Sequence, residues 1–159
     1  MSRLKIINKK GEVFNALYDD KYSKEVCSHK WYIQKKGKKA YVRSTQCKER
    51  FYLHRLILGF PKDKVIDHIN GNTLDNRESN LRACLTRENS RNRGLSKNNT
   101  SGFKGVYFSR VTNSWAAHIK YMYKSYSKSG FPTPLEASRW YDTKALQLYG
   151  EFARLNQTI

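Results

Sequence analysis

The sequence predicts an α+β protein built from two small parts. Residues 65–92 have the pattern of a strand, a polar loop, a returning strand and a short helix, because apolar stretches flank turn residues at 70–72. Residues 103–149 have the pattern of three strands followed by one amphipathic helix. A length of 159 residues suits one ordinary domain or two small ones. The two patterns therefore predict two parts, each with a modest core.

The composition favours a polyanionic partner. Lys and Arg number 31 against 13 Asp and Glu, which gives a net charge of +18 spread along the chain. No apolar stretch is long enough to span a membrane and no signal-like segment follows Met1, so we expect nucleic acid as the partner and an intracellular, cytoplasmic or nucleoid-associated location. Cys27, Cys47 and Cys84 form no Cys-x-x-Cys pair, which indicates inert thiols in a reducing compartment.

The first part is predicted to contain a basic hairpin before the strand–loop–strand pattern. Apolar and charged residues alternate at 30–37 and 39–44, on either side of Gly37. FYLHRLILGF (51–60) fits a helix and a strand equally well. VIDHI (65–69) predicts a strand and NLRACL (80–85) the strand that returns beside it. Thr86 is the predicted N-cap of a helix that runs through Asn92.

The second part follows a polar, basic segment, 91–102, which predicts a linker or an arm that orders on a phosphate backbone. Three strand-like stretches come next: FKGVYFSR (103–110), SWAAHIKYMY (114–123) and KSYSKSGF (124–131). Thr133 and Pro134 are typical of a helix start, and Gly150 of its end. We expect Trp115, Trp140 and Phe131 in the core.

Asp67, His68, Asn80 and Asn89 form a candidate site for phosphodiester hydrolysis. This reaction needs a base for water and a cation that neutralises charge on the phosphate and the leaving oxygen. His68 suits the base, because an unperturbed imidazole, with a pKa of ~6.5, is mostly neutral near pH 7. Asp67 offers a hard carboxylate oxygen to Mg²⁺ or a similar ion, and Asn89 an amide oxygen. Asn80 is expected to accept from one imidazole nitrogen and fix the tautomer.

Adjacent residues of a regular strand point to opposite faces, which constrains this site. We therefore expect the strand to end or bend at His68. The residue types alone also fit a structural or solvated loop. A calcium-binding loop is excluded, because Ile69 stands at the third position of that motif. His29 and His118 are expected to be surface or packing histidines.

Three segments in fixed order, LHRLILG, VIDHINGNTLDNRESNLR and TRENSRN, resemble the HNH endonucleases, specifically the branch typified by phage-encoded homing endonucleases. The resemblance covers about residues 51–93 and implies a ββα-metal site in which Asp67 binds the metal, His68 is the general base and Asn80 orients His68. Asn89 stands where many members carry a metal-binding histidine. The resemblance also implies one divalent ion per site, Mg²⁺ or Mn²⁺, and products with a 5′-phosphate and a 3′-hydroxyl. Arg55, of the His-Arg pair, is expected either to reach a phosphate or to have a structural role.

Residues 101–156 resemble an AP2/ERF DNA-binding domain through SGFKGVYFSR, SWAAHIK and SGFPTPLEASRWYDTKALQLYGEFARLN. The resemblance implies a three-stranded sheet in the DNA major groove with a helix packed behind it. Several positions depart from the plant-type pattern: Tyr107 and Ser109 stand where arginines are typical, and His118 replaces a usual glutamate. Arg110, Lys124 and Tyr126 are added because they could share the wet face of the sheet. The candidate DNA contacts of this sheet are Lys104, Tyr107, Arg110, His118, Lys120, Lys124 and Tyr126.

Together these features predict a homing-type, site-selective DNA endonuclease acting on double-stranded DNA. The expected organisation is a basic β-rich region at 1–50, the nuclease core at 51–93, a linker at 94–102 and the AP2/ERF-like domain at 103–156. No small-molecule cofactor and no membrane partner is expected, and the oligomeric state is left open. One alternative is a non-catalytic, sequence-selective DNA-binding regulator. A weaker one is an RNA-binding protein, although no aromatic RNP motif is present.

Overall fold

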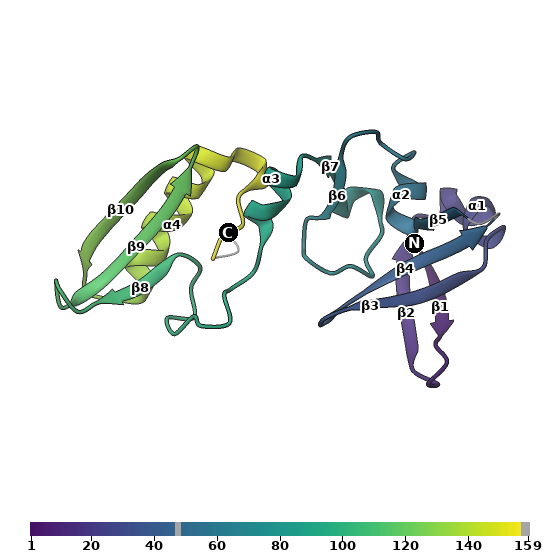
Figure 1. The fold of residues 1–159 in the computed structure, drawn as a ribbon, viewed down its shortest axis with the longest axis horizontal. Coiled ribbons are helices and arrows are strands. Elements are labelled where there is room, and N and C mark those ends of the chain that lie inside the picture. Colours follow the sequence, from purple (N-terminus) through teal and green to yellow (C-terminus); the bar gives the residue numbers. More distant parts are fainter. Residues whose placement is uncertain (47–48, 157–159) are drawn as a thin grey trace. The chain divides into compact units, whose positions relative to one another are not determined.

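The computed structural model describes residues 1–46 and 49–156, so Cys47 lies outside the described residues. The chain divides into two compact units, Met1–Asn89 and Ser90–Ile159. Figure 1 shows the order of the elements within each unit. No helix in the described ranges is long and apolar enough to cross a membrane.

The first unit begins with two antiparallel β structures. β1 (Ser2–Ile7) pairs with β2 (Val13–Tyr18), and a second sheet has the order β3-β4-β5. Its strands are β3 (Trp31–Lys36), β4 (Lys39–Gln46) and β5 (Glu49–Tyr52), and α1 (Ser23–Cys27) precedes them. The predicted hairpin about Gly37 is confirmed, with Gly37 at φ 59°. The ambiguous stretch 51–60 is partly strand and partly helix, because β5 ends at Tyr52 and α2 (Leu53–Ile57) follows at once.

One hydrophobic core joins these elements to the strand–loop–strand segment. Side chains from β1, β2, α1, β3, β4, α2 and β7 contribute to it: Ile6, Ala16, Tyr18, Val26, Trp31, Val42, Leu53, Ile57 and Leu81. Leu53 and Val26 are completely buried, and burying a side chain of that size stabilises a fold by roughly 1.5–3 kcal/mol. The expected region 1–50 therefore shares its core with the start of the expected nuclease segment.

The strand, loop, strand and helix predicted over 65–92 are present in that order. β6 (Val65–His68) pairs antiparallel with β7 (Leu81–Cys84), and α3 (Thr86–Asn89) follows. The helix is shorter than predicted, because residues 90–92 form a 3-10 turn (η3, Ser90–Asn92). Thr86 lies inside the helix instead of capping it. Leu85 therefore occupies the N-cap position, and its backbone N–H donates to the Glu88 carboxylate (2.8 Å).

The second unit is a three-stranded antiparallel sheet packed on one helix, as the sequence predicts. The strands β8 (Val106–Ser109), β9 (Ser114–Tyr121) and β10 (Lys124–Phe131) have the order β10-β9-β8. α4 (Pro134–Tyr149) packs against one face of this sheet (Figure 1). The Thr133 hydroxyl accepts from the Glu136 N–H (3.2 Å) and Gly150 ends the helix at φ 55°, which confirms both predicted ends. Trp115, Trp140 and Phe131 pack against the core, also as predicted.

Gly105 allows the sheet and the helix of the second unit to approach closely. Its φ is 73°, and a β-carbon built on it would lie 2.2 Å from the Tyr141 ring and 2.8 Å from the His118 carbonyl oxygen. Tyr141 is a buried core residue of α4. A side chain at this position would therefore have to displace both the ring and the strand backbone.

Gly105→Ala should lower the free energy of unfolding of the second unit by about 3 kcal/mol or more, because overpacking adds to the cost of a left-handed alanine. Gly130→Ala is the matched control, since Gly130 also has a positive φ (88°) but nothing within 4 Å of its β-carbon position. It should cost only about 1–2 kcal/mol. Thermal unfolding of both variants measures the difference, and equal losses would show that the approach of Tyr141 does not matter.

Candidate active site and nucleic-acid interface

Asp67 and His68 are the last two residues of β6, and both are buried, with 6% and 5% of their surfaces exposed. They pair with different residues of β7: Asp67 lies opposite Arg82, and His68 lies opposite Leu81. The chain turns directly after His68, where the Gly71 N–H donates to the His68 carbonyl (2.8 Å). The expectation that the strand ends at His68 is confirmed.

The Asp67 carboxylate forms an ion pair with its cross-strand neighbour. Arg82 Nε and Nη2 donate to Asp67 Oδ2 at 3.0 and 2.7 Å, and both side chains are largely buried. A buried carboxylate needs such compensation, because desolvation of a charge is costly. Arg82 is not among the site residues predicted from the sequence, although the antiparallel return of β7 is a signal that could have placed it opposite Asp67.

The loop between β6 and β7 is cross-linked by its own polar side chains. Asp75, 2% exposed, accepts from Arg77 Nε (2.8 Å) and Nη2 (2.7 Å) and from Asn70 Nδ2 (2.9 Å). The hydrogen bonds from Arg77 lower the pKa of Asp75. The Asn80 amide spans the loop, donating to the Asp75 carbonyl (2.8 Å) and accepting from the Asn70 N–H (3.0 Å). This stretch is therefore an ordered structure and differs from a solvated loop.

The amide that faces the imidazole belongs to Asn76. Asn76 Oδ1 lies 3.5 Å from His68 Nε2, and its Nδ2 donates to the Leu74 carbonyl (3.1 Å). We expected Asn80 to contact the imidazole, but both ends of its amide bond to the loop backbone. Asn76 is not among the site residues predicted from the sequence. Four asparagines crowd this stretch, and nothing in the local sequence distinguishes the one that is buried beside the histidine.

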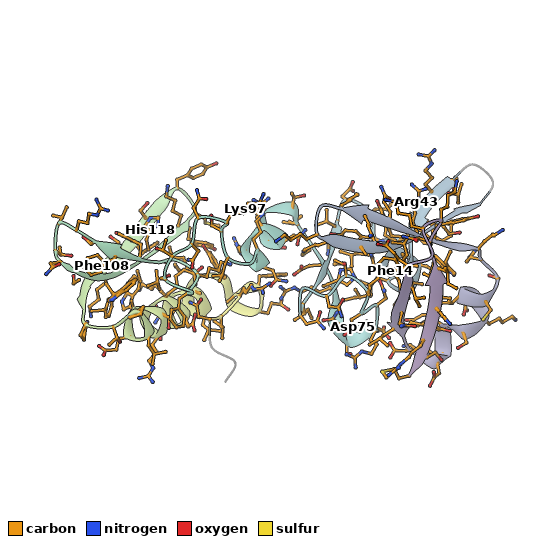
Figure 2. All side chains as sticks on the ribbon, turned by 90° about the horizontal axis from the view of Figure 1, so that it is seen from below. Phe14, Arg43, Asp75, Lys97, Phe108 and His118 are labelled. Carbon is orange, nitrogen blue, oxygen red and sulfur yellow. The ribbon has the colours of Figure 1, made fainter. Side chains whose placement is uncertain are left out.

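The N-terminal hairpin fixes the position of Asn76. Leu17 of β2 forms a parallel bridge with Asp75. The Leu17 N–H donates to the Leu74 carbonyl and the Asn76 N–H donates to the Leu17 carbonyl, both at 2.8 Å. The Asp19 carboxylate accepts from the Glu78 N–H (2.8 Å) further along the same loop. Figure 2 labels Asp75 on this loop and Phe14 on β2, within the same unit.

A second buried histidine, His54 of α2, lies beside His68. The two rings are 5.2 Å apart in an edge-to-face arrangement, and His54 stacks on Tyr52 at 5.2 Å. Burial, with smaller contributions from the charges of His68, Arg55 and Lys36, lowers the pKa of His54 to about 3. Burial also lowers the pKa of His68, which its hydrogen bond with Asn76 and the nearby Asp67 charge oppose. Both imidazoles are therefore neutral near pH 7, the state that a proton-accepting base requires.

Arg55 has a structural contact in this unit. Its guanidinium donates to the Pro61 carbonyl (2.7 Å) and to the Lys64 carbonyl (3.3 Å), so it ties α2 to the segment that leads into β6. Of the two roles expected for Arg55, this contact supports the structural one.

Asn89, the other expected metal ligand, is the last residue of α3, which packs against β6. The Cys84 thiol lies near both expected ligands: burial raises the pKa of Cys84, the Asp67 charge raises it further, and a hydrogen bond from the Asn89 backbone lowers it. No group of three or more His, Cys, Asp or Glu side chains within residues 1–46 and 49–156 is arranged to hold an ion. One carboxylate and one amide nevertheless fit Mg²⁺, which keeps several waters and usually takes one or two carboxylates together with substrate phosphates.

The expected DNA contacts of the second unit fall on both faces of its sheet. Residues that pair directly across antiparallel strands share a face. Tyr107 pairs with Ala116, His118 with Ser127 and Lys120 with Ser125, and none of these residues belongs to the hydrophobic core under α4. Tyr107, His118 and Lys120 therefore lie on the open face. Figure 2 labels His118 and Phe108 on two neighbouring strands of this sheet.

The expectation that Tyr126 and Lys124 share that open face is wrong. Tyr126 pairs with the core residue Ile119 and packs against the core, and Lys124 is two residues earlier on the same strand. Arg110 is exposed in the turn after β8. Lys104 is partly buried and donates to the Arg91 carbonyl, and burial together with the Arg154 charge lowers the pKa of Lys104 to about 8.

Comparisons with known proteins bear on the family of this chain. A family profile described as HNH endonuclease matches residues 51–91. The chain is 37% identical over 94 residues to Protein 3.8 of Escherichia phage T7, a match that covers 59% of this chain and 77% of that protein. It is 34% identical over 134 residues to Uncharacterized HNH endonuclease L560 of Acanthamoeba polyphaga mimivirus, covering 83% of this chain and 69% of that one. No solved structure matches.

These matches, together with the buried Asp-His pair at the end of β6, define the class as a DNA phosphodiester hydrolase. The chain belongs to the HNH endonuclease family. The resemblance predicted for residues 51–93 is thereby confirmed at the level of the family, and DNA is the implied substrate. The resemblance of residues 101–156 to AP2/ERF domains stays a prediction.

The low pKa of His54 predicts a pH-dependent stability of the first unit. An unfolded histidine has a pKa near 6.5, so between pH 6.5 and about 3 the unfolded chain binds a proton that the folded chain excludes. The free energy of unfolding should therefore fall on acidification, by about 2 kcal/mol between pH 7 and pH 5 from this group. His54→Gln should reduce that loss.

Hydrogen exchange of the β4 amides at pH 7 and pH 5 measures the free energy of unfolding of the first unit, because β4 belongs to that unit alone. His118→Gln, a histidine substitution in the second unit, is the control and should leave the loss unchanged. If the free energy of unfolding had the same pH dependence in wild type and His54→Gln, the low pKa of His54 would be contradicted.

Proposed function

We propose that this chain is a metal-dependent, site-selective DNA endonuclease of the homing type, with His68 as the general base. The observation that carries the proposal is the buried His68 imidazole at the end of β6, next to the Asp67 carboxylate and facing an amide oxygen. Membership of the HNH endonuclease family supports the same chemistry. The proposed products have a 5′-phosphate and a 3′-hydroxyl.

The tautomer of His68 follows from its contact with Asn76. The Asn76 amide oxygen is a suitable acceptor for a hydrogen on His68 Nε2, since the Asn76 nitrogen already donates to a carbonyl. In that tautomer Nδ1 carries the lone pair and accepts the proton of the attacking water. A neutral amide suits this role, because a carboxylate would favour the imidazolium and raise the pKa of the base.

Asp67 and Asn89 are the proposed metal ligands, for one Mg²⁺ or Mn²⁺ ion. The bound ion would neutralise charge on the phosphate and the leaving 3′-oxygen. Arg82 keeps the Asp67 carboxylate in place, and pairing is compatible with metal binding because a carboxylate has about four lone-pair sites. Asn80, which was expected to orient His68 directly, is proposed to act through the loop that carries Asn76.

The second unit is proposed to position the nuclease on DNA, as AP2/ERF-like domains do. The open face of its sheet presents Tyr107, His118 and Lys120, with Arg110 in the adjoining turn. Residues 103–131 contain five Lys or Arg residues and no Asp or Glu. Phosphate contacts from these cations would supply affinity, and contacts to base edges would supply specificity.

Purified protein should cut a plasmid that carries the flanking region of its own gene, and only with Mg²⁺ or Mn²⁺ present. His68→Ala should reduce the cleavage rate roughly a hundred- to ten-thousand-fold, the usual contribution of a general base. Asp67→Asn, which keeps the shape of the side chain, should also abolish cleavage. Thermal unfolding of each variant controls for folding. Intact plasmid with wild type, combined with tight binding, would support the alternative of a non-catalytic DNA-binding regulator.

Asn76→Ala should lower the cleavage rate about 10- to 100-fold at unchanged DNA affinity, because it removes the amide that holds the His68 tautomer. Asn72→Ala is the matched control in the same loop: Asn72 is exposed and its side chain accepts from the Leu74 N–H (3.1 Å). It should cut within about threefold of wild type. Equal effects of the two substitutions would argue that Asn76 only shapes the loop.

A further inference from the structure

The turn between β9 and β10 consists of Met122 and Tyr123. The strands pair up to Tyr121 and Lys124, which lie opposite each other, so the turn has two residues. Both have left-handed backbones, with φ of 44° and 66°. Asn-Gly is the preferred sequence for such a turn, because a β-carbon is poorly tolerated at positive φ. Met-Tyr is thus a sequence that the turn geometry disfavours.

The other turn of the same sheet follows the usual rule. Between β8 and β9 the left-handed position is held by Asn113, at φ 44°. Asparagine is among the residue types that enter this region most readily. Backbone strain from large side chains is therefore a property of the β9–β10 turn and not of the sheet as a whole, and such strain is concentrated at functional positions in proteins.

Both side chains of the β9–β10 turn point away from the protein. Tyr123 is fully exposed and Met122 is 65% exposed. Among the described residues, neither side chain takes part in a hydrogen bond, ion pair or ring contact. Packing within the chain therefore does not compensate the strain of this turn.

The residues that lead into this turn are held firmly. The Tyr121 ring lies 5.9 Å from the Tyr149 ring of α4, and the Arg91 guanidinium lies over both rings at 5.2 and 4.9 Å. The Tyr149 hydroxyl donates to the Lys120 carbonyl. The turn is thus presented on a braced support, which limits the entropy lost when it binds a partner.

The surroundings of the turn favour DNA as that partner. Lys120 and Lys124 flank it, and the whole stretch 103–131 lacks acidic residues. A DNA duplex offers negative phosphates for the lysines and apolar base faces for the two side chains. Aromatic side chains stack on bases, and methionine is among the residues that enter between base steps.

We infer that Met122 and Tyr123 form a wedge that enters the DNA base stack and unstacks one step of the bound duplex. The inference rests on the proposed DNA-binding role of the second unit. Insertion of a wedge costs least energy at base steps that unstack easily, so we expect the bound DNA site to contain such a step.

The test uses the full chain with His68→Ala, so that DNA is not cut, and a short duplex from the flanking region of its own gene. Met122→Asn together with Tyr123→Gly gives the turn its preferred sequence. This variant should melt at a higher temperature, bind the duplex about tenfold more weakly and lose the permanganate-reactive thymine that the parent protein induces. The matched control is Val111→Ser, because Val111 is 96% exposed in the other turn of the sheet. It should leave affinity and permanganate reactivity unchanged.

Equal affinity and equal thymine reactivity in the turn variant would overturn the wedge and leave the DNA-binding role of the second unit intact. Failure of the parent protein to bind the duplex would overturn both. A parallel arm uses vesicles of phosphatidylglycerol and phosphatidylcholine. Loss of vesicle binding with unchanged DNA binding in the turn variant would assign the turn to a membrane surface and overturn the inference.

Discussion

The hydrogen bonds around Asp75 are the constraint on which the first unit depends. They turn a stretch rich in asparagine into a rigid loop, because Arg77, Asn70 and Asn80 all bond to this one residue. Such a network stabilises the fold only when every polar group in it is hydrogen-bonded, since an unpaired buried carboxylate would lower the stability. Its effect reaches His68 through Asn76, the next residue along the chain. The surroundings of the His68 imidazole therefore depend on groups that do not contact it.

Burial and charge act on the site in opposite directions. The apolar and aromatic surroundings of His54 and His68 favour uncharged imidazoles, whereas the Asp67 charge favours a proton on His68. Desolvation dominates, so the pKa of His68 lies below its usual value. At Asp67 the ion pair with the Arg82 guanidinium offsets the cost of burying a carboxylate. Two adjacent residues thus have different environments because a strand sends them to different sides.

Local patterns were sufficient to predict most of the fold. The hairpin about Gly37, the β6–β7 pair, the three-stranded sheet and the capped helix α4 all follow from alternation, turn residues and caps. The end of β6 at His68 followed from strand geometry. Contacts between distant segments, such as the bridge from Leu17 to the loop before β7, could not be predicted from the sequence. The same is true of the contact between the His68 imidazole and Asn76, which was expected for Asn80. The face of Tyr126 was also missed, because register and not residue type decides it.

The bridge between Leu17 and Asp75 limits which segment of this chain could be moved into another protein and still fold. The segment that defines the family covers residues 51–91, yet the backbone that supports its loop comes from β2, more than thirty residues earlier. The motif that a sequence search recognises is therefore smaller than the unit that folds. A gene fusion that transplanted only residues 51–91 would carry Asp67 and His68 without the strand that supports their loop, so a transferable unit has to include the whole hydrophobic core of the first unit.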